Sequence, residues 1–300
     1  MHRLKNLKIP VYFYPLAAML FWGLSFIWSS ILLKYYPPVT IIFVRLIISS
    51  SFLFLLVFLL KKHEKIARSD YWLFICSAFF NPFFYFLGEN YGLKYTSSTI
   101  ASVIIATIPV FSPITAYLTF REKLSWINIV GILVSFLGIV VMLITKDLSL
   151  GVDIRGIFFL AGAVVASLFY SVFLRKLTMK YSPLTIISRQ NLIGIILFLP
   201  FFLIFEAHSS FQVKINQEIM TSFLLLAILA SSLSFVFYTK TIQLFGISKA
   251  NIFSNLIPVF TAIFSFLLLS EYFSFQKIIG ILIVIGGVFL SEINKKKPAT

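Results

Sequence analysis

The chain contains one four-residue motif twice, and this repeat constrains its fold more than any other feature. Ile108-Pro109-Val110-Phe111 returns 149 positions later as Ile257-Pro258-Val259-Phe260. Aligned without gaps, residues 98–144 and 247–293 are identical at 15 of 47 positions, including Glu122/Glu271, Gly131/Gly280 and Gly138/Gly287. Repetition at about half the length of a 300-residue chain indicates a duplicated module. The fold must therefore consist of two related halves.

The composition places both halves in a membrane. Apolar residues make up 60% of the chain and charged residues only 12%, whereas soluble domains carry roughly 25% charged residues. About 20 consecutive apolar residues cross a bilayer as a helix. We therefore predict an all-α integral membrane protein with ten spans, at about 12–33, 39–60, 71–93, 98–119, 125–145, 154–174, 183–205, 219–243, 248–270 and 275–293.

The basic residues indicate the orientation of these spans. If the amino terminus is cytoplasmic, 16 of the 25 Lys and Arg residues fall in cytoplasmic segments, 6 fall outside and 3 fall within helices. Such an excess is typical of cytoplasmic loops, which predicts that both termini lie in the cytoplasm. The formal charge of +15 is spread over short clusters between apolar runs. We therefore expect no nucleic-acid partner.

The repeat and the span count together predict an inverted architecture. The first repeat covers residues 12–146 and the second 154–293, with short basic cytoplasmic tails at 1–11 and 294–300. Each repeat has five spans, an odd number, so the second enters the membrane from the opposite side. Inverted repeats around a central cavity are typical of secondary transporters. A static membrane scaffold or receptor is the alternative.

These residues resemble paired EamA domains of the drug/metabolite transporter superfamily, over essentially the whole chain. The resemblance rests on matching positions in the two halves. In the first half these are Trp22-Gly23, Pro38, Arg45, Ile108 to Phe111, Glu122, Gly131 and Gly138; in the second they are Pro183, Gln190, Ile257 to Phe260, Glu271, Gly280 and Gly287. Two positions depart from internal symmetry. Ala166-Ser167 stands where Trp22-Gly23 does, and Gln190 stands where Arg45 does.

The resemblance implies a gradient-driven transporter of small metabolites that works by alternating access. Amino acids or related amphiphilic compounds are the expected substrates, and export is more usual than import. We expect a multi-pass protein of the bacterial inner membrane whose partners are the lipid bilayer and a small-molecule substrate. Protons as coupling ion and a homodimeric state are open options.

Motifs for other chemistry are missing from the sequence. No Gly-rich loop ends in Gly-Lys-Ser/Thr, which argues against an ATP-driven pump. The histidines are His2, His63 and His208, all in a terminus or loops, so no intramembrane histidine cluster could hold a metal. We expect no cofactor and no enzymatic activity, with an intramembrane lipid-modifying enzyme as a remote alternative.

Two prolines and two asparagines are candidate features of the fourth and ninth spans. Pro109 and Pro258 each remove a backbone hydrogen bond near mid-span, which favours helix kinks that bend during transport; tolerated packing kinks are the alternative. Asn251 and Asn255 lie four residues apart on one expected helical face. They could bind a polar substrate or join helices, each bond worth about 0.6–2 kcal/mol.

Ionisable residues within spans are the next candidates, because burying charge in a bilayer is costly. Arg45 and Glu89 are expected at similar depth, so they could form a pair, and Glu89 could carry a coupling proton. The alternative is that both reach the outer interface by snorkelling. Arg189 and Lys240 could likewise snorkel, or attract an anionic substrate group.

Aromatic and hydroxyl residues complete the predicted pathway. Trp22, Ser25, Trp28, Tyr85, Ser167, Tyr170 and Tyr238 could line a cavity suited to a small amphiphilic metabolite; ordinary packing is the alternative for each. The predicted substrate pathway comprises Trp22, Ser25, Arg45, Tyr85, Glu89, Ser167, Tyr170, Gln190, Tyr238, Asn251 and Asn255, with kinks at Pro109 and Pro258.

Overall fold

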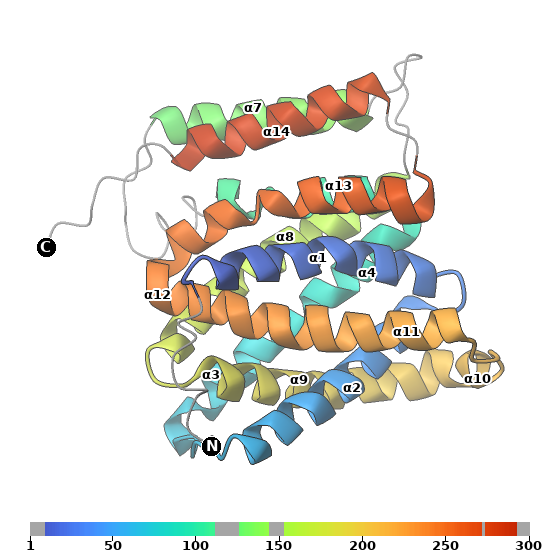
Figure 1. Ribbon diagram of the computed structural model, residues 1–300, viewed down its shortest axis with the longest axis vertical. Helices are drawn as coiled ribbons and strands as arrows, with labels where there is room; N and C mark the ends of the chain where they lie inside the picture. Colours follow the sequence, from blue (N-terminus) through green and yellow to red (C-terminus); the bar gives the residue numbers. More distant parts are fainter. Residues whose placement is uncertain (1–9, 112–125, 144–152, 272–273, 293–300) are drawn as a thin grey trace, which may run out of the picture.

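A computed structural model describes residues 10–111, 126–143, 153–271 and 274–292. Every regular element in these ranges is a helix (Figure 1). The first repeat contains α1 Phe13–Leu32, α2 Pro38–Leu59, η1 Arg68–Asp70, α3 Tyr71–Ala78, η2 Phe79–Phe84, α4 Tyr85–Tyr95, α5 Ser98–Ile105 and α7 Trp126–Leu143. The second contains α8 Ile154–Thr178, α9 Pro183–Phe201, η3 Phe202–Glu206, α10 Ala207–Phe211, α11 Gln217–Leu225, η4 Leu226–Ser234, α12 Phe235–Phe253, α13 Leu256–Leu269 and α14 Phe275–Glu292.

The apolar helices match the ten predicted spans. Among the described residues, six are long and apolar enough to cross a membrane, and four shorter apolar helices accompany them. The long ones are Phe13–Leu32, Pro38–Leu59, Arg68–Tyr95, Ile154–Thr178, Pro183–Phe211 and Gln217–Phe245; the short ones are Ser98–Phe111, Ile129–Val141, Leu256–Leu269 and Ile278–Gly287. The prediction of an all-α membrane protein is confirmed.

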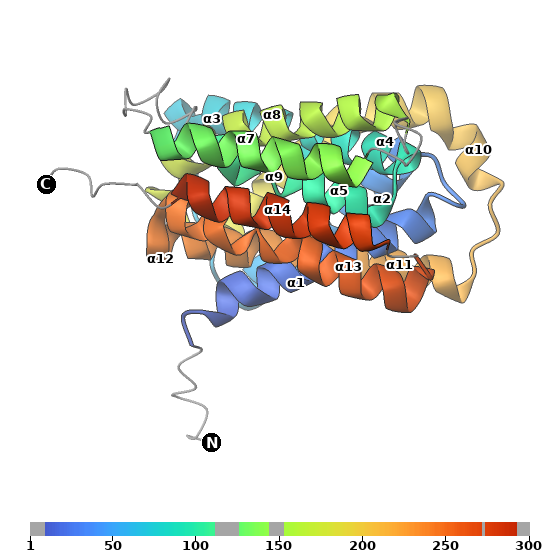
Figure 2. The ribbon, with the colours of Figure 1, turned by 90° about the horizontal axis from the view of Figure 1, so that it is seen from above.

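Two pairs of equivalent helices, α2 with α9 and α7 with α14, pack antiparallel. At the start of α2, the Thr40 backbone N–H donates to Glu206, which lies just beyond the end of α9. Further along α2, the Ser49 hydroxyl accepts from the Asn191 side chain in the middle of α9. The pair α7 and α14 lies side by side along one flank of the molecule (Figures 1 and 2). A Cβ on Gly138 would lie 2.7 Å from the Val284 nitrogen, so this glycine permits close approach, as the sequence predicts.

The first helix of each repeat packs on the third span of the other repeat. In the first repeat, α4, the last part of the third span, packs on α8, the first helix of the second repeat. Its counterpart in the second repeat, η4 with α12, packs on α1, which opens the first. This exchange is the pattern expected of two inverted repeats.

The two spans that carry the repeated motif are each interrupted just before its proline. Turns occur at residues 106–107 and at residues 254–255, because neither Pro109 nor Pro258 can donate to the carbonyl four residues earlier. Two details of the prediction were therefore wrong. The helix α12 continues through the expected connection at 244–249. Asn255 lies in the break, so it is not one regular helical turn after Asn251.

The third helix of each repeat departs from regular α-helix. In the first repeat, η2 contains a kink at Asn81, directly before Pro82; in the second, η4 is a π-helical segment at nearly the equivalent position. π-helical segments within helices often occur at functional sites. Both face the interior of the bundle, where η2 contacts α8 and α9 and η4 contacts α1 and α2.

Carboxylates of one repeat bind helix N-termini of the other. The repeated residue Glu271 accepts from the Ser98 backbone N–H and the Thr99 hydroxyl at the start of α5. Glu206 does the same for Thr40 in α2, and Glu64 accepts from the Ser182 N–H beside α9. Anions stabilise helix N-termini in this way. Glu122, the counterpart of Glu271, and both basic tails lie outside the described residues.

Candidate functional site

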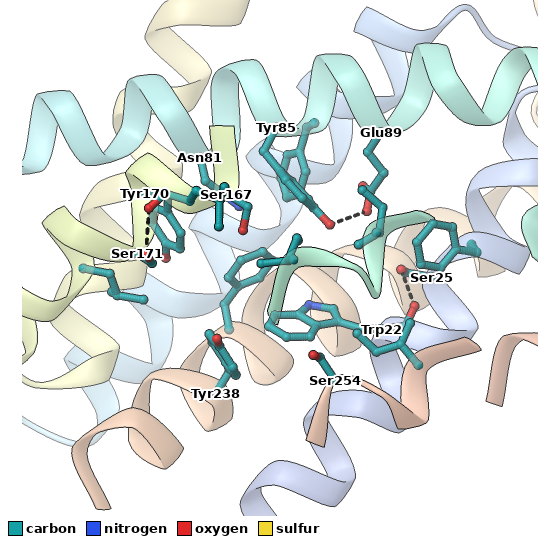
Figure 3. A pocket seen from close by; sticks show the side chains of 18 of the residues that line it. Trp22, Ser25, Asn81, Tyr85, Glu89, Ser167, Tyr170, Ser171, Tyr238 and Ser254 are labelled. Carbon is teal, nitrogen blue, oxygen red and sulfur yellow. Dashed lines mark hydrogen bonds between the residues drawn. The ribbon is translucent and has the colours of Figure 1, made fainter. Parts of the chain in front are cut away.

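A cavity of about 70 Å³ lies between the two repeats. Figure 3 shows side chains from helices of both repeats, including α1, α4, α8 and α12, pointing toward it. Its polar and aromatic lining consists of Trp22, Ser25, Phe26, Arg45, Asn81, Tyr85, Phe86, Glu89, Ser167, Tyr170, Ser171, Phe235, Tyr238 and Ser254. The rest of the lining is aliphatic and includes Ile108 and Ile257 of the repeated motif.

Eight of the eleven predicted pathway residues lie in this lining: Trp22, Ser25, Arg45, Tyr85, Glu89, Ser167, Tyr170 and Tyr238. They come from five spans that are distant in sequence, so the fold brings them together. Their role in transport stays a prediction, because position alone assigns none.

Arg45 is the most buried cation of the site, with 2% of its surface exposed. Its Nε donates to the Ser231 hydroxyl at 2.7 Å, and its guanidinium carbon lies 4.0 Å from the centre of the Phe86 ring. The Nη1 atom lies 3.7 Å from Glu89 Oε2, and Nη1 has no hydrogen-bond partner among the described residues. The pair that the sequence allowed is thus formed, but loosely.

Glu89 is buried as well, with 7% of its surface exposed. The Tyr85 hydroxyl, one helical turn earlier, donates to Glu89 Oε1 at 3.1 Å (Figure 3). The snorkelling alternative is therefore wrong for both Glu89 and Arg45. Each side chain turns into the bundle toward the opposite charge, since a nearby counter-ion offsets part of the cost of burial.

At the position equivalent to Arg45, Gln190 forms a neutral counterpart. Its Nε2 donates to the Ser77 hydroxyl, and its Oε1 accepts from the Tyr170 hydroxyl at 3.3 Å. Gln190 is 2% exposed and lies behind Tyr170, so it does not line the cavity itself. It holds the lining residue Tyr170 in place.

Aromatic side chains line the cavity between the Arg45–Glu89 pair and Tyr170. The Trp22 ring lies 5.0 Å from both the Phe235 and Tyr238 rings, measured between centroids. Ser25 donates to the Trp22 carbonyl one turn earlier on α1. Apolar walls with a few placed polar groups are typical of small-molecule sites.

Several other predicted residues lie away from the cavity lining. Trp28 packs in a separate cluster with Leu32 and Tyr36, and Arg189 lies over the Phe54 ring. Neither Lys240 nor the two prolines belong to the lining. Asn255 is buried with both amide atoms unpartnered among the described residues, and it too is outside the lining. The Asn251 side chain lies outside the described residues.

Several polar residues were not predicted from the sequence. Asn81, Ser171 and Ser254 line the cavity, and Ser77 and Ser231 bind Gln190 and Arg45. Asn81 leaves helical geometry at φ −148° and ψ 116° within η2, directly before Pro82. The Asn-Pro dipeptide inside an apolar span was the available signal, because a residue before proline is disfavoured in the helix. No comparable signal distinguishes the serines from others in the chain.

Comparison with known proteins agrees with this architecture. The sequence model of the EamA-like transporter family matches residues 9–144 and 154–293. The uncharacterized transporter YetK of Bacillus subtilis is 28% identical over 287 residues, which cover 94% of this chain and 86% of YetK. An uncharacterized transporter of Archaeoglobus fulgidus is 27% identical over 270 residues, or 90% of this chain and 94% of that protein.

A solved crystal structure shares the fold, with a TM-score of 0.71 at 16% sequence identity; the match covers 94% of this chain and 98% of the other. The family model covers nearly all of both repeats. The chain therefore belongs to the EamA-like transporter family.

Proposed function

We propose that this protein is a gradient-driven exporter of amino acids or related small amphiphilic metabolites, working by alternating access in the bacterial inner membrane. One observation carries the proposal: the two repeats enclose a cavity that contains the buried Arg45–Glu89 pair. Buried charges in a membrane protein are costly and are usually kept for function. Binding of a polar metabolite is the function that this arrangement supports best.

Widening of this cavity is an expected step of transport. The cavity volume of about 70 Å³ is small. We expect a metabolite to enter when the repeats move apart on one side. The interrupted spans at residues 106–107 and 254–255 are suited to this movement, because Pro109 and Pro258 have already removed backbone bonds there.

Proton coupling through Glu89 is part of the proposal. Glu89 is the acidic residue of the cavity lining, and it faces Arg45 of α2 and the hydroxyl of Tyr85. A carboxylate in this position can gain a proton when the distance to its counter-ion changes. Tyr238 of α12 also lines the cavity, so the surroundings of Glu89 include both charged and neutral partners.

Counterflow tests the transport proposal without assuming a coupling ion. Purified protein is reconstituted into vesicles preloaded with an unlabelled amino acid, and the labelled compound is added outside. Transient accumulation of label in excess of protein-free vesicles is expected for at least one of the twenty amino acids. Folded protein that gives no counterflow with amino acids or with cationic organic compounds would favour the scaffold alternative.

A further inference from the structure

We propose that Arg45 is the binding subsite for a carboxylate of the substrate, and that Ser231 is the positioning residue that aims it. This inference rests on the proposed transport function and specifies its substrate: a compound that carries a monoanionic carboxylate. Ser231 belongs to the second repeat and Arg45 to the first. The subsite is therefore assembled across the interface between the repeats.

The guanidinium of Arg45 is fixed on two sides. Nε donates to Ser231 Oγ at 2.7 Å, and Cζ lies over the Phe86 ring, 4.0 Å from the ring centre. Phe86 is 2% exposed and packs in turn against Phe235. These two contacts hold the long side chain of Arg45 in one conformation, so little entropy is lost when a ligand binds.

The other edge of the guanidinium has a donor without an acceptor. Nη1 is buried and unpartnered among the described residues, and the nearest carboxylate oxygen, Glu89 Oε2, is 3.7 Å away. That distance is longer than a hydrogen bond. Glu89 Oε1 is engaged by Tyr85 instead. An unpaired buried donor is costly, and a ligand carboxylate in the adjoining cavity would supply the missing acceptor.

The charge balance favours a monoanion. Glu89 lies within 4 Å of Nη1, so a ligand with two negative charges, such as a phosphate monoester, would meet strong repulsion there. A ligand carboxylate adds only one negative charge beside the Arg45 guanidinium and the Glu89 carboxylate. A ligand that also carries an ammonium group could direct it to Glu89.

Ser231 is itself held by the π-helical geometry of η4. Its hydroxyl donates to the Leu226 carbonyl, five residues earlier, which leaves its lone pairs to accept from Arg45. The Ser231 carbonyl accepts from Asn191 of α9. Ser231 is 1% exposed. The residue is thus a rigid acceptor, directed at Arg45 by an unusual local backbone.

The adjacent Ser232 provides a matched control. It belongs to the same π-helical segment, is fully buried, and donates to the Ala227 carbonyl five residues earlier. Its second partner is the hydroxyl of Ser49, and among the described residues Ser232 forms no hydrogen bond with Arg45. Removing either hydroxyl should disturb the packing of η4 about equally. Only the loss of Ser231 should release Arg45.

Equilibrium binding to detergent-purified protein tests the proposal. Calorimetric titrations would use benzoate, the twenty amino acids and the carboxamide of each acid that binds. We expect the wild type to prefer carboxylate over carboxamide by about tenfold or more, the size expected for a hydrogen bond between charged groups. Ser231→Ala should lower carboxylate affinity about five- to tenfold, Ser231→Thr should restore most of it, and Ser232→Ala should match the wild type.

Each contrary outcome has a defined meaning. A wild type that binds none of these carboxylates, or that binds acid and amide equally well, overturns the subsite. Equal losses in Ser231→Ala and Ser232→Ala overturn the positioning role. Carboxylate-dependent binding without counterflow would contradict the transport function and leave the subsite intact. Equal counterflow of an acid and its carboxamide would contradict the subsite and leave the transport function intact.

A spectroscopic readout separates positioning from general destabilisation. The Arg45 Nε–H signal in a proton–nitrogen correlation spectrum is assigned by its loss in Arg45→Lys. Ser231→Ala should shift or broaden this signal, while Ser232→Ala should leave it in place. An unchanged signal in a folded Ser231→Ala variant would contradict the hydrogen bond on which the proposal depends.

Discussion

Two polar groups at equivalent positions of the two repeats differ in one essential respect. Arg45 in α2 and Gln190 in α9 are each seven residues after the proline that begins their helix. Each reaches into the opposite repeat for a serine hydroxyl, Arg45 to Ser231 and Gln190 to Ser77. We call the Arg45–Glu89 region the charged end of the cavity and the Gln190–Tyr170 region the neutral end.

This comparison shows how a nearly symmetric scaffold can hold an asymmetric site. Duplication supplies two equivalent helix positions whose side chains reach across the interface. Arg45 contacts the π-helical segment η4, and Gln190 contacts Ser77, just before the kinked segment η2. Only one of them carries charge, so a substrate with a charged group should bind in one orientation. The neutral end is closed by hydrogen bonds from Gln190 to Ser77 and from Tyr170 to Gln190, whereas the charged end retains an unpaired donor.

The largest expected effect comes from removing one partner of the charged end. Arg45→Gln and Glu89→Gln each leave a buried charge without its counter-ion, which should cost about 3 kcal/mol of stability. Arg45→Gln makes the charged end resemble the neutral end, and the double variant removes both charges. We expect the double variant to lose no more than half of the stability that the two single variants lose in sum, measured by denaturation in micelles. Simply additive losses would show that the two charges do not interact.

A second prediction concerns the proton. In proteoliposomes, counterflow-competent wild-type protein should transport faster when a pH gradient is imposed. Glu89→Gln should keep measurable counterflow but lose this response, because a carboxamide does not gain or lose a proton near neutral pH. The double variant with Arg45→Gln serves as the control for folding. A Glu89→Gln variant that still responds to the gradient would remove Glu89 from the coupling mechanism.

The smallest effect is expected at the neutral end. Tyr170→Phe removes one hydrogen bond to Gln190, worth about 1 kcal/mol. Transport should fall about fivefold through a higher KM, with the preference for carboxylate unchanged. Initial rates measured over a range of substrate concentrations check this. Loss of the carboxylate preference in Tyr170→Phe would show that the two ends are not functionally separate.

The sequence was sufficient to predict the architecture because its signals are regular. Long apolar runs determine the spans, and the repeated motif around Pro109 and Pro258 determines the duplication. The similar depth of Arg45 and Glu89 followed from span positions, whereas the choice between a buried pair and snorkelling needed the structure. These features depend on periodicity and composition, which a single sequence displays directly.

The details of the site depend on departures from regular helix, which the sequence displays poorly. Ser231 lies in the π-helical segment η4, and Ser77 lies just before the kinked segment η2. Many serines in the chain look the same in sequence. Likewise, the break at Ser254 and Asn255 follows from Pro258, but it moved Asn255 off the face that regular spacing predicts. The sequence showed Glu271 only as a repeated position, and its contact with the start of α5 in the opposite repeat became visible only in the structure.

The central claim is that substrate passes through the cavity between the repeats, and a cysteine placed in the lining tests it most directly. Ser167 lines the cavity and is partly exposed. In Ser167→Cys combined with Cys76→Ser, a small thiol reagent should abolish counterflow, and substrate should protect against it. Wild-type protein, whose natural Cys76 lies outside the lining, should keep its activity. Full counterflow after complete modification of the cysteine at position 167 would contradict the account.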